Sequence, residues 1–201
     1  MNNEKAPQKS NSILQSIYDF AEIFVIAICV VMIFFSLGSR LCRVNGDSMY
    51  STLHNGEMLL VSDLAYTPKQ GDIVVFHQTH ATNPRLNEPI VKRVIATEGQ
   101  HVYVDYDTAK VYVSDDDVFD ETDVLEEDYD YIDNELGIIT DPYYARNKTY
   151  VVPEGCVFVM GDNRNNSLDS RSADIGMVDE RRILGKVIIR LTPLSRFGKV
   201  D

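Results

Sequence analysis

The sequence predicts a mostly β protein, an antiparallel barrel or sandwich that follows one N-terminal apolar helix and is interrupted by a small acidic insertion. Three observations predict this architecture. Residues 23–37 form an apolar run without a single charge. Short runs of β-branched and aromatic residues, separated by glycine and proline turns, follow it, and no long helical periodicity returns. Residues 105–141 hold 15 acidic residues and one basic residue.

The chain has 201 residues, which suits one domain of ordinary size with an insertion. We therefore divide it into an N-terminal segment (residues 1–19), an anchor (residues 20–38) and a β domain built from residues 39–104 and 146–201. The remaining residues, 105–145, form the acidic inserted lobe.

The anchor is a membrane-spanning helix by length and composition. Residues 20–38 are 19 residues that include Glu22, and a spanning helix needs about 20. The segment is long enough if Glu22 lies at the lipid headgroups. A cleavable signal peptide is the alternative, because residues 36–38 place small side chains at alternate positions. We favour the uncleaved anchor, since Lys5 and Lys9 lie far from the apolar run, whereas the charges of a signal peptide adjoin it.

Eight strands are expected after the anchor, each a short run rich in valine, isoleucine, tyrosine or phenylalanine. Turn signals such as those at residues 68–71 and 98–99 separate them. A short turn is expected at residues 178–183. The expected strands are residues 57–61, 72–76, 90–95, 101–104, 110–113, 149–152, 156–160 and 186–191.

The acidic segment accounts for the negative charge of the whole chain, which has a formal net charge of −12. We expect this segment to be a solvated face or loop. A calcium site is the alternative, but residues 115–120 lack the glycine that an EF-hand loop needs at its turn. No basic stripe with interleaved aromatic residues is found, so nucleic acid is not an expected partner.

Cysteines and histidines predict neither a disulfide framework nor a metal centre. The three cysteines are too few for a framework, and Cys29 lies in the apolar run. Cys42 and Cys156 could pair only if their Cα atoms came within about 7 Å, and we favour two small buried hydrophobic residues. The four histidines lack the cysteine or carboxylate spacing of a metal site, so we expect no metal and no cofactor.

Three polar features fall where apolar or turn residues would be ordinary. Residues 161–171, Gly-Asp-Asn-Arg-Asn-Asn-Ser-Leu-Asp-Ser-Arg, directly follow the strand at residues 156–160. Ser48 lies in a turn-like segment, and Lys92 lies inside the apolar strand at residues 90–95. Alternate residues of a strand share a face, so Lys92 shares one with two apolar residues. It is either an edge residue whose amine reaches water or a desolvated amine.

These segments resemble the sequence boxes of the type I signal peptidases, which are membrane-anchored serine proteases with a Ser/Lys dyad. The resemblance extends from about Gly46 to Leu191, and residues 161–171 are its most specific part. It implies an N-terminus in the cytoplasm and a catalytic domain outside it, in a cell membrane crossed once. In this family a variable lobe is inserted between the lysine strand and residues 161–171. The lobe is small here, as in the compact, single-span bacterial type.

The resemblance implies that Ser48 is the nucleophile and Lys92 the general base. An ammonium group cannot accept a proton, so the base must be desolvated, which lowers the pKa of a lysine from its usual value of about 10.4. Ile90, Val94 and Met49 are the expected apolar walls. The neutral amine takes the proton of the serine hydroxyl, an acyl-enzyme forms, and water later hydrolyses it.

Residues 161–171 resemble the structural support of the family's active site. The resemblance implies that Ser167 hydrogen-bonds the amine of the general base and orients it. Asp169 and Arg171 would form an ion pair that stiffens the site, and Asp162 and Arg164 would brace the loop.

Several positions depart from the family pattern. Some members carry a serine two positions before the nucleophile, where its hydroxyl stabilises the oxyanion; this chain has Gly46, which leaves the Ser48 N–H as the expected donor. Ser51 replaces the usual proline and Glu57 the usual aspartate. Residues 96–100, Ala-Thr-Glu-Gly-Gln, replace a common Gly-x-Pro-Gly-Asp turn.

The expected partners are secretory preproteins and membrane lipid. The resemblance implies cleavage after small residues at the first and third positions before the scissile bond. Ser48 lies ten residues past Gly38, so an extended chain keeps it within about 35 Å of the end of the anchor. One alternative is a Ser/Lys self-cleaving regulator such as the SOS-response repressors, which carry a DNA-binding module instead of an anchor. The other, a non-enzymatic single-pass binding domain, leaves Lys92 and residues 161–171 unexplained.

Overall fold

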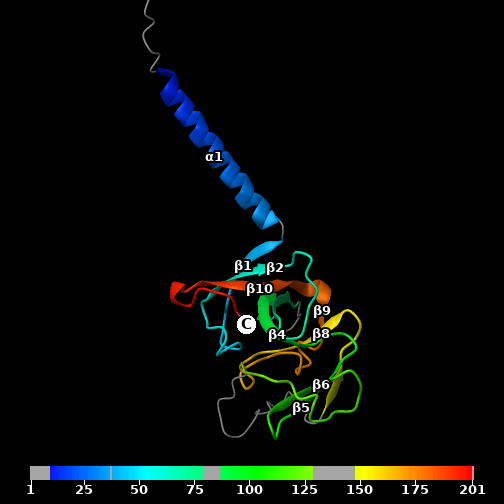
Figure 1. Cartoon of the computed structure of the whole chain (residues 1–201). Helices are drawn as coiled ribbons and strands as arrows, with labels where there is room; N and C mark the ends of the chain where they lie inside the picture. Colours follow the sequence, from blue (N-terminus) through cyan, green and yellow to red (C-terminus); the bar gives the residue numbers. More distant parts are fainter. Residues whose placement is uncertain (1–9, 37, 79–86, 129–147, 201) are drawn as a thin grey trace, which may run out of the picture. The chain divides into compact units, whose positions relative to one another are not determined.

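The computed structural model describes residues 10–36, 38–78, 87–128 and 148–200 (Figure 1). The chain divides into two compact units, residues 1–39 and residues 40–201, which we describe separately. Residues 1–9 of the predicted N-terminal segment and residues 129–145 of the predicted lobe lie outside the described part, as does His80, one of the four histidines considered above.

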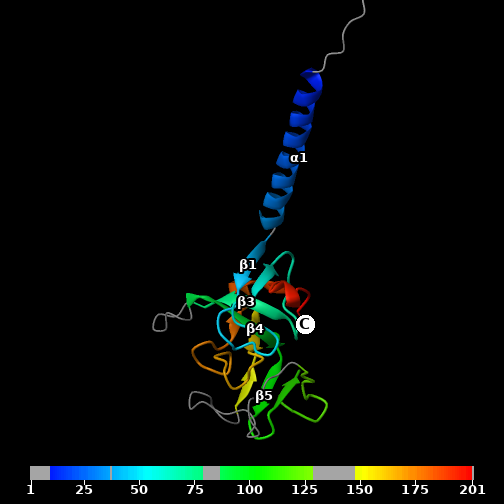
Figure 2. The same ribbon diagram turned by 90° about the vertical axis from the view of Figure 1, so that its left-hand side faces the viewer.

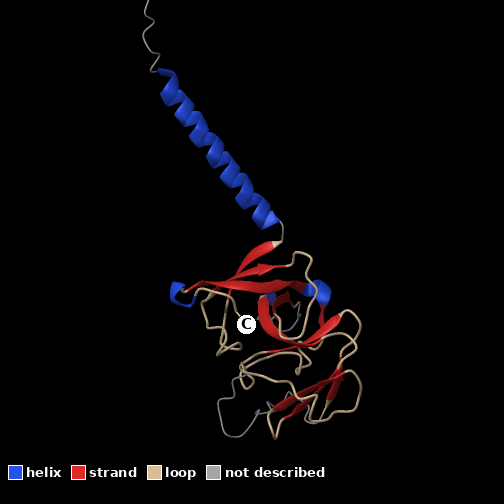
Figure 3. Cartoon of the chain, in the orientation of Figure 1, coloured by secondary structure: helices blue, strands red, loops and turns tan. Residues whose placement is uncertain are grey.

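The first unit consists of helix α1, Ser10–Ser36, drawn in blue in Figure 3. The helix begins ten residues before the predicted anchor at residues 20–38. The physical reason is that Asp19 and Glu22 interrupt an apolar run without interrupting helical hydrogen bonding. The stretch Leu14–Ile33 has 20 residues and is long and apolar enough to cross a membrane.

The second unit consists of two antiparallel sheets, so the prediction of a mostly β protein with one N-terminal apolar helix is confirmed. The larger sheet has the strand order β1-β2-β10-β3-β4-β8-β9, and the smaller one β6-β5-β7. The strands are β1 Ser39–Arg43, β2 Met58–Ser62, β3 Ile73–His77, β4 Pro89–Ala96, β5 His101–Asp105, β6 Lys110–Ser114, β7 Thr149–Val151, β8 Cys156–Met160, β9 Val178–Asp179 and β10 Ile183–Thr192.

All eight predicted strands are present, with ends that differ from the prediction by three residues at most. Strand β1 was not predicted, because Ser-Arg-Leu-Cys-Arg is too polar to show a strand pattern. The turn predicted at residues 178–183 is the short strand β9 followed by a 3₁₀ helix, Glu180–Arg182. Local sequence patterns therefore identify the strands but miss the shortest and most polar ones.

Strand β10 joins the two halves of the larger sheet, because it pairs with both β2 and β3. Gly185 makes this possible. Its φ of +139° lies in a region that L side chains rarely adopt, and a Cβ there would overlap the backbone of Ser62. Glycine at position 185 therefore lets β10 lie close enough to β2 to pair with it as well as with β3. As a result the larger sheet is continuous from β1 to β9.

Strand β4 is an interior strand of this sheet, with β3 on one side and β8 on the other (Figure 2 shows β3 beside β4). Lys92 lies opposite Val74 of β3, and Arg93 lies opposite Met160, the last residue of β8. Residues 161–171 therefore begin beside Lys92. An interior position excludes the edge interpretation of Lys92.

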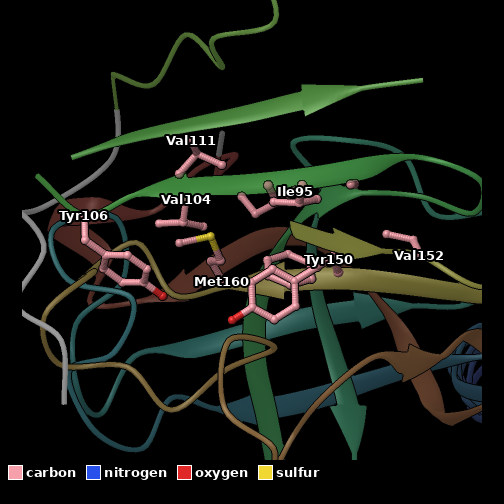
Figure 4. Packing of buried hydrophobic residues seen from close by; sticks show 10 residues of the cluster. Ile95, Val104, Tyr106, Val111, Tyr150, Val152 and Met160 are labelled. Carbon is pink, nitrogen blue, oxygen red and sulfur yellow. The ribbon is translucent and has the colours of Figure 1, made fainter. Parts of the chain in front are cut away.

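The core between the two sheets is built from side chains of both. Figure 4 shows members of this cluster, among them Ile95 of β4, Val104 of β5 and Met160 of β8. Val111 of β6 is fully buried in the same cluster. Each such aliphatic side chain contributes roughly 1.5–3 kcal/mol to folding by leaving water. The first part of the predicted acidic lobe, through β6, is thus packed against the rest of the unit.

Candidate active site

The side chains of Ser48 and Lys92 meet in the structure, although they are 44 residues apart. The Lys92 Nζ lies 2.7 Å from the Ser48 Oγ and donates a second hydrogen bond to the Val91 carbonyl at 2.9 Å. Ser48 belongs to a tight turn, in which the N–H of Leu53 donates to the Met49 carbonyl at 2.8 Å. Ser48 is partly exposed, whereas Lys92 is only 3% exposed. The serine is therefore partly accessible to solvent, and the lysine beside it is enclosed.

The enclosure of Lys92 changes its protonation. Burial is the largest influence on the amine and lowers its pKa to about 8. The carboxylates of Asp169 and Asp162 act in the opposite direction and raise the pKa, whereas the guanidinium of Arg171 lowers it. Roughly a tenth of the amine is then neutral at pH 7, and about half at pH 8. A neutral amine in contact with a hydroxyl can accept its proton.

The neighbours of Lys92 in β4 belong to two buried apolar clusters. Val91 lies in a buried cluster with Met49, which is 1% exposed. Val94 lies in a second buried cluster, against which Ile90 packs. The three predicted wall residues thus belong to the two apolar clusters that flank the lysine strand.

Residues 161–171 hold the Ser48 turn through backbone contacts. The N–H of Asn163 donates to the Ser48 carbonyl at 3.0 Å, and the Asn163 amide donates to the Asp47 carbonyl at 3.1 Å. A Cβ at Gly161 would overlap both the Ser48 carbonyl oxygen and the Ser167 Oγ. The close approach therefore requires glycine at position 161, and Asn163 is a contact that sequence reasoning did not single out.

Asp169 and Arg171 form the predicted ion pair and are both buried. Arg171 donates from Nε to Oδ1 at 2.8 Å and from Nη2 to Oδ2 at 2.9 Å. The Ser167 hydroxyl donates to the same carboxylate at 2.7 Å, and the Gly161 N–H donates at 3.1 Å. Burial alone would raise the pKa of Asp169, but the charge and hydrogen bonds of Arg171 hold it below its usual value. The role predicted for Ser167 toward the lysine amine stays a prediction.

Asp162 and Arg164 are buried as expected of loop braces, but their partners come from other segments. Asp162 accepts from Arg93 at 2.9 and 2.8 Å and from the Thr52 hydroxyl at 2.6 Å. It thereby joins the lysine strand and the serine turn to residues 161–171. Arg164 pairs with Glu127 of the acidic segment, donating from Nη1 at 2.7 Å. Because Asp162 is occupied by Arg93, Arg164 takes the distant carboxylate.

The positions that depart from the family pattern have clear structural settings. Gly46 has a φ of +92°, where an L side chain would be strained, and its N–H donates to the Asn55 side chain at 3.2 Å. Glu57 is buried and accepts from Arg190 at 3.1 Å and Arg196 at 2.7 Å. The longer glutamate therefore reaches two arginines near the C-terminus.

The cysteines Cys42 and Cys156 are separate free thiols, each partly buried. Burial raises the pKa of both, and nearby Asp179 adds to the effect at Cys156. Within the described ranges, no group of three histidine, cysteine or carboxylate side chains could hold a metal ion.

A serine hydroxyl in contact with a buried, partly neutral lysine, on an antiparallel β scaffold, defines a candidate site of the serine/lysine hydrolase class. A family model described as signal peptidase, peptidase S26, matches residues 17–192. The chain therefore belongs to the signal peptidase family. This membership decides against the self-cleaving regulator and the non-enzymatic binding domain.

Two relatives agree with the family match. A probable signal peptidase I-1 from Synechocystis is 34% identical over 163 residues, which are 78% of this chain and 73% of that protein. A signal peptidase IB from Staphylococcus aureus is 35% identical over 160 residues, 77% of this chain and 78% of that protein. A solved signal peptidase I from Enterococcus faecalis is 29% identical and matches 60% of this chain and 97% of its own, with a TM-score of 0.41.

Proposed function

We propose that Ser48 is the nucleophile and Lys92 the general base of the signal peptidase reaction of this chain. As a signal peptidase I of peptidase family S26, the chain is a serine peptidase that removes signal peptides from preproteins. The observation that carries the assignment is the 2.7 Å contact between the Ser48 Oγ and a lysine amine that burial makes partly neutral.

The reaction proceeds in two proton-balanced halves. The neutral Lys92 amine accepts the Ser48 proton while Oγ attacks the scissile carbonyl. The resulting ammonium protonates the leaving amine as the C–N bond breaks, which leaves an ester on Ser48. Water then attacks the ester, gives a proton to Lys92, and the signal peptide leaves as a carboxylic acid while the serine hydroxyl is restored. A separation of 2.7 Å serves the hydrogen bond in either direction.

The oxyanion of each tetrahedral intermediate is stabilised by the Ser48 N–H, because Gly46 offers no side-chain donor. Met49 forms part of the dry wall beside the dyad. Five buried polar residues of the supporting segment hold the serine turn and the lysine strand in position relative to each other. They are Asp162, Arg164, Ser167, Asp169 and Arg171. The contacts described for these residues support such a positioning role.

We further propose that the protein is a catalytic domain anchored to the membrane by its N-terminal helix. Helix α1 lies among membrane lipids with the N-terminus in the cytoplasm, and residues 40–200 lie on the extracytoplasmic side. The apolar helix in the described part of the chain and the membrane anchoring of the family support the anchor, and the family resemblance is the ground for the orientation. The two antiparallel sheets act as one sandwich-like catalytic unit, and the substrates are secretory preproteins with small residues at the first and third positions before the cleaved bond.

The test uses full-length protein in detergent and a model preprotein. Wild-type protein should release the mature product, whereas Ser48→Ala, Lys92→Ala and Lys92→Arg should each reduce turnover to background. Ser48→Ala should melt close to the wild type, whereas Lys92→Arg should melt at a lower temperature, because it buries a permanently charged guanidinium where the wild type has a partly neutral amine. Substantial cleavage by any of the three variants would overturn the assignment of the dyad.

A further inference from the structure

Part of the acidic segment is fixed to the sheet and is not a solvated loop. The N–H of Val113 donates to the Asp123 carbonyl at 2.9 Å, and the N–H of Leu125 donates to the Val111 carbonyl at 2.8 Å. Through these bonds a short segment around Val124 pairs with β6 in the antiparallel sense at the edge of the smaller sheet. Leu125 packs against the core cluster between the sheets. Glu127 therefore lies two residues after a segment that is fixed to β6 and to the core.

Glu127 differs from its acidic neighbours in burial. Its side chain is 6% exposed, whereas Glu126 and Asp128 are exposed. The carboxylate meets the guanidinium of Arg164 with both oxygens, one of them 2.7 Å from Nη1. Arg164 has the largest fully buried side chain of the described residues. A bidentate pair of this kind fixes orientation as well as charge.

Arg164 connects this pair to the backbone that carries the active site. Its Nε donates to the Gly161 carbonyl at 3.1 Å, and its own carbonyl accepts from the Arg171 Nη2 at 2.8 Å. Between these two points lies Asn163, whose N–H holds the Ser48 carbonyl. The Arg164 guanidinium therefore fixes the backbone at residues 161–164, the segment that supports the nucleophile.

We propose that Glu127 is a positioning residue of the signal peptidase reaction, acting through Arg164 on the backbone that supports Ser48. The inference rests on the proposed Ser48 and Lys92 dyad. Sequence reasoning treated the acidic segment as a solvated face, and the structure assigns one of its carboxylates to the support of the catalytic site.

The reason a carboxylate is needed lies in the chemistry of arginine. A guanidinium does not lose its proton in a protein, so a buried one needs an anionic partner or water. Without Glu127, Arg164 would draw water inward or move outward and pull the Gly161 carbonyl with it. Either change loosens the Ser48 turn and hydrates the pocket of Lys92, whose low pKa depends first on burial.

The test compares Glu127→Gln with Glu126→Gln in the full-length protein, using the same preprotein. Both variants remove one negative charge from adjacent positions, but only Glu127 is bound to Arg164. Glu127→Gln should lower kcat by about tenfold or more with KM within about twofold, because misplacement of reacting groups acts on the chemical step. The acid limb of its pH profile should move to higher pH. Glu126→Gln should match the wild type in kcat, KM and pH profile.

A cycle with Arg164→Gln separates positioning from general destabilisation. If Glu127 acts through Arg164, the double variant should lose no more kcat than the stronger single variant. Equal kcat and pH profiles for Glu127→Gln and Glu126→Gln would overturn the inference, as would a loss that only follows the unfolded fraction at the assay temperature. Inactive wild-type protein, or an active Ser48→Ala variant, would instead overturn the dyad.

Should Glu127→Gln be recovered only unfolded, Glu127→Asp decides the question. It keeps the charge but shortens the side chain by one methylene, so we expect a folded enzyme with kcat between those of the wild type and the dyad variants. A Glu127→Asp enzyme with wild-type kcat and pH profile would contradict a positioning role.

Discussion

Lys92 shows how one residue can couple burial to chemistry. Its pKa of about 8 means that the neutral, proton-accepting form is lost as pH falls through 8. The same shift costs stability: below pH 8 the amine is protonated in both folded and unfolded states, and its burial then costs roughly 3 kcal/mol relative to a lysine with the unfolded pKa of about 10.4. The cost is relieved as pH rises from 8 toward 10.4. The active site is therefore held against this cost by the surrounding packing.

Gly161 provides a second test at the residue scale. Gly161→Ala should lower kcat by about a hundredfold, because the new Cβ must displace the Ser48 carbonyl or the Ser167 hydroxyl and so shift the nucleophile. Single-turnover kinetics of preprotein cleavage would measure this. Gly99→Ala is the control: its φ of +81° strains the backbone, but the added Cβ meets open space away from the site, so it should lower stability and leave kcat unchanged. Wild-type kcat in Gly161→Ala would refute the close-approach argument.

The sequence-based predictions at the residue scale reached contacts that are local or part of a known pattern. The pairing of Asp169 with Arg171 was implied by the family resemblance, and their separation of two residues is compatible with it. Arg93 and Asp162 are 69 residues apart, and no spacing rule connects them. A clue was present in Arg93, a charge in the middle of an apolar strand that needs a buried partner.

At the scale of elements, β4 carries the site because both of its adjacent charged residues, Lys92 and Arg93, are buried in an interior strand. Their side chains point to opposite faces of the strand and have partners of different charge. Lys92 is left with a hydroxyl and a carbonyl as partners, whereas Arg93 receives the carboxylate of Asp162. One strand therefore supplies both the proposed base, Lys92, and a permanently charged residue, Arg93, that pairs with Asp162 of the supporting loop.

The ion pair between Arg93 and Asp162 should be one of the larger stabilising contacts between elements. Asp162→Ala leaves a buried guanidinium without its carboxylate and should lower the free energy of unfolding by about 3–5 kcal/mol. Urea denaturation would measure the loss. Asp179→Ala is the matched control, because its partner Arg181 is exposed and should rehydrate at little cost. Equal midpoints for the two variants would show that burial does not set the strength of these pairs.

The strands themselves were predictable because alternation and turn residues are local signals, whereas their pairing was not. Strand β10 pairs with β2 and β3, which lie more than 100 residues earlier in the chain. Strand β4 is interior because it pairs with β8 as well as with β3, and this interior position excludes the edge interpretation of Lys92. The burial of the proposed general base, Lys92, thus depends on strand pairing that no single segment of the sequence shows.

At the scale of the whole molecule, the chain combines one apolar helix with a β unit that carries all the proposed site residues. The predicted topology puts the N-terminus in the cytoplasm and residues 40–200 outside. In intact spheroplasts, an external protease should therefore degrade the β unit and leave a tag at the N-terminus protected. Permeabilised cells are the control, in which the tag is also lost. Protection of the β unit with loss of the tag would reverse the orientation.

We propose above all that a buried amine, partly neutral near physiological pH, accepts the proton of Ser48. A nitrogen NMR titration of the Lys92 side chain, with its resonance assigned by its absence in Lys92→Arg, measures this directly. We expect a midpoint near pH 8 in the folded protein. A midpoint near 10.4, the value of a lysine in water, would contradict it.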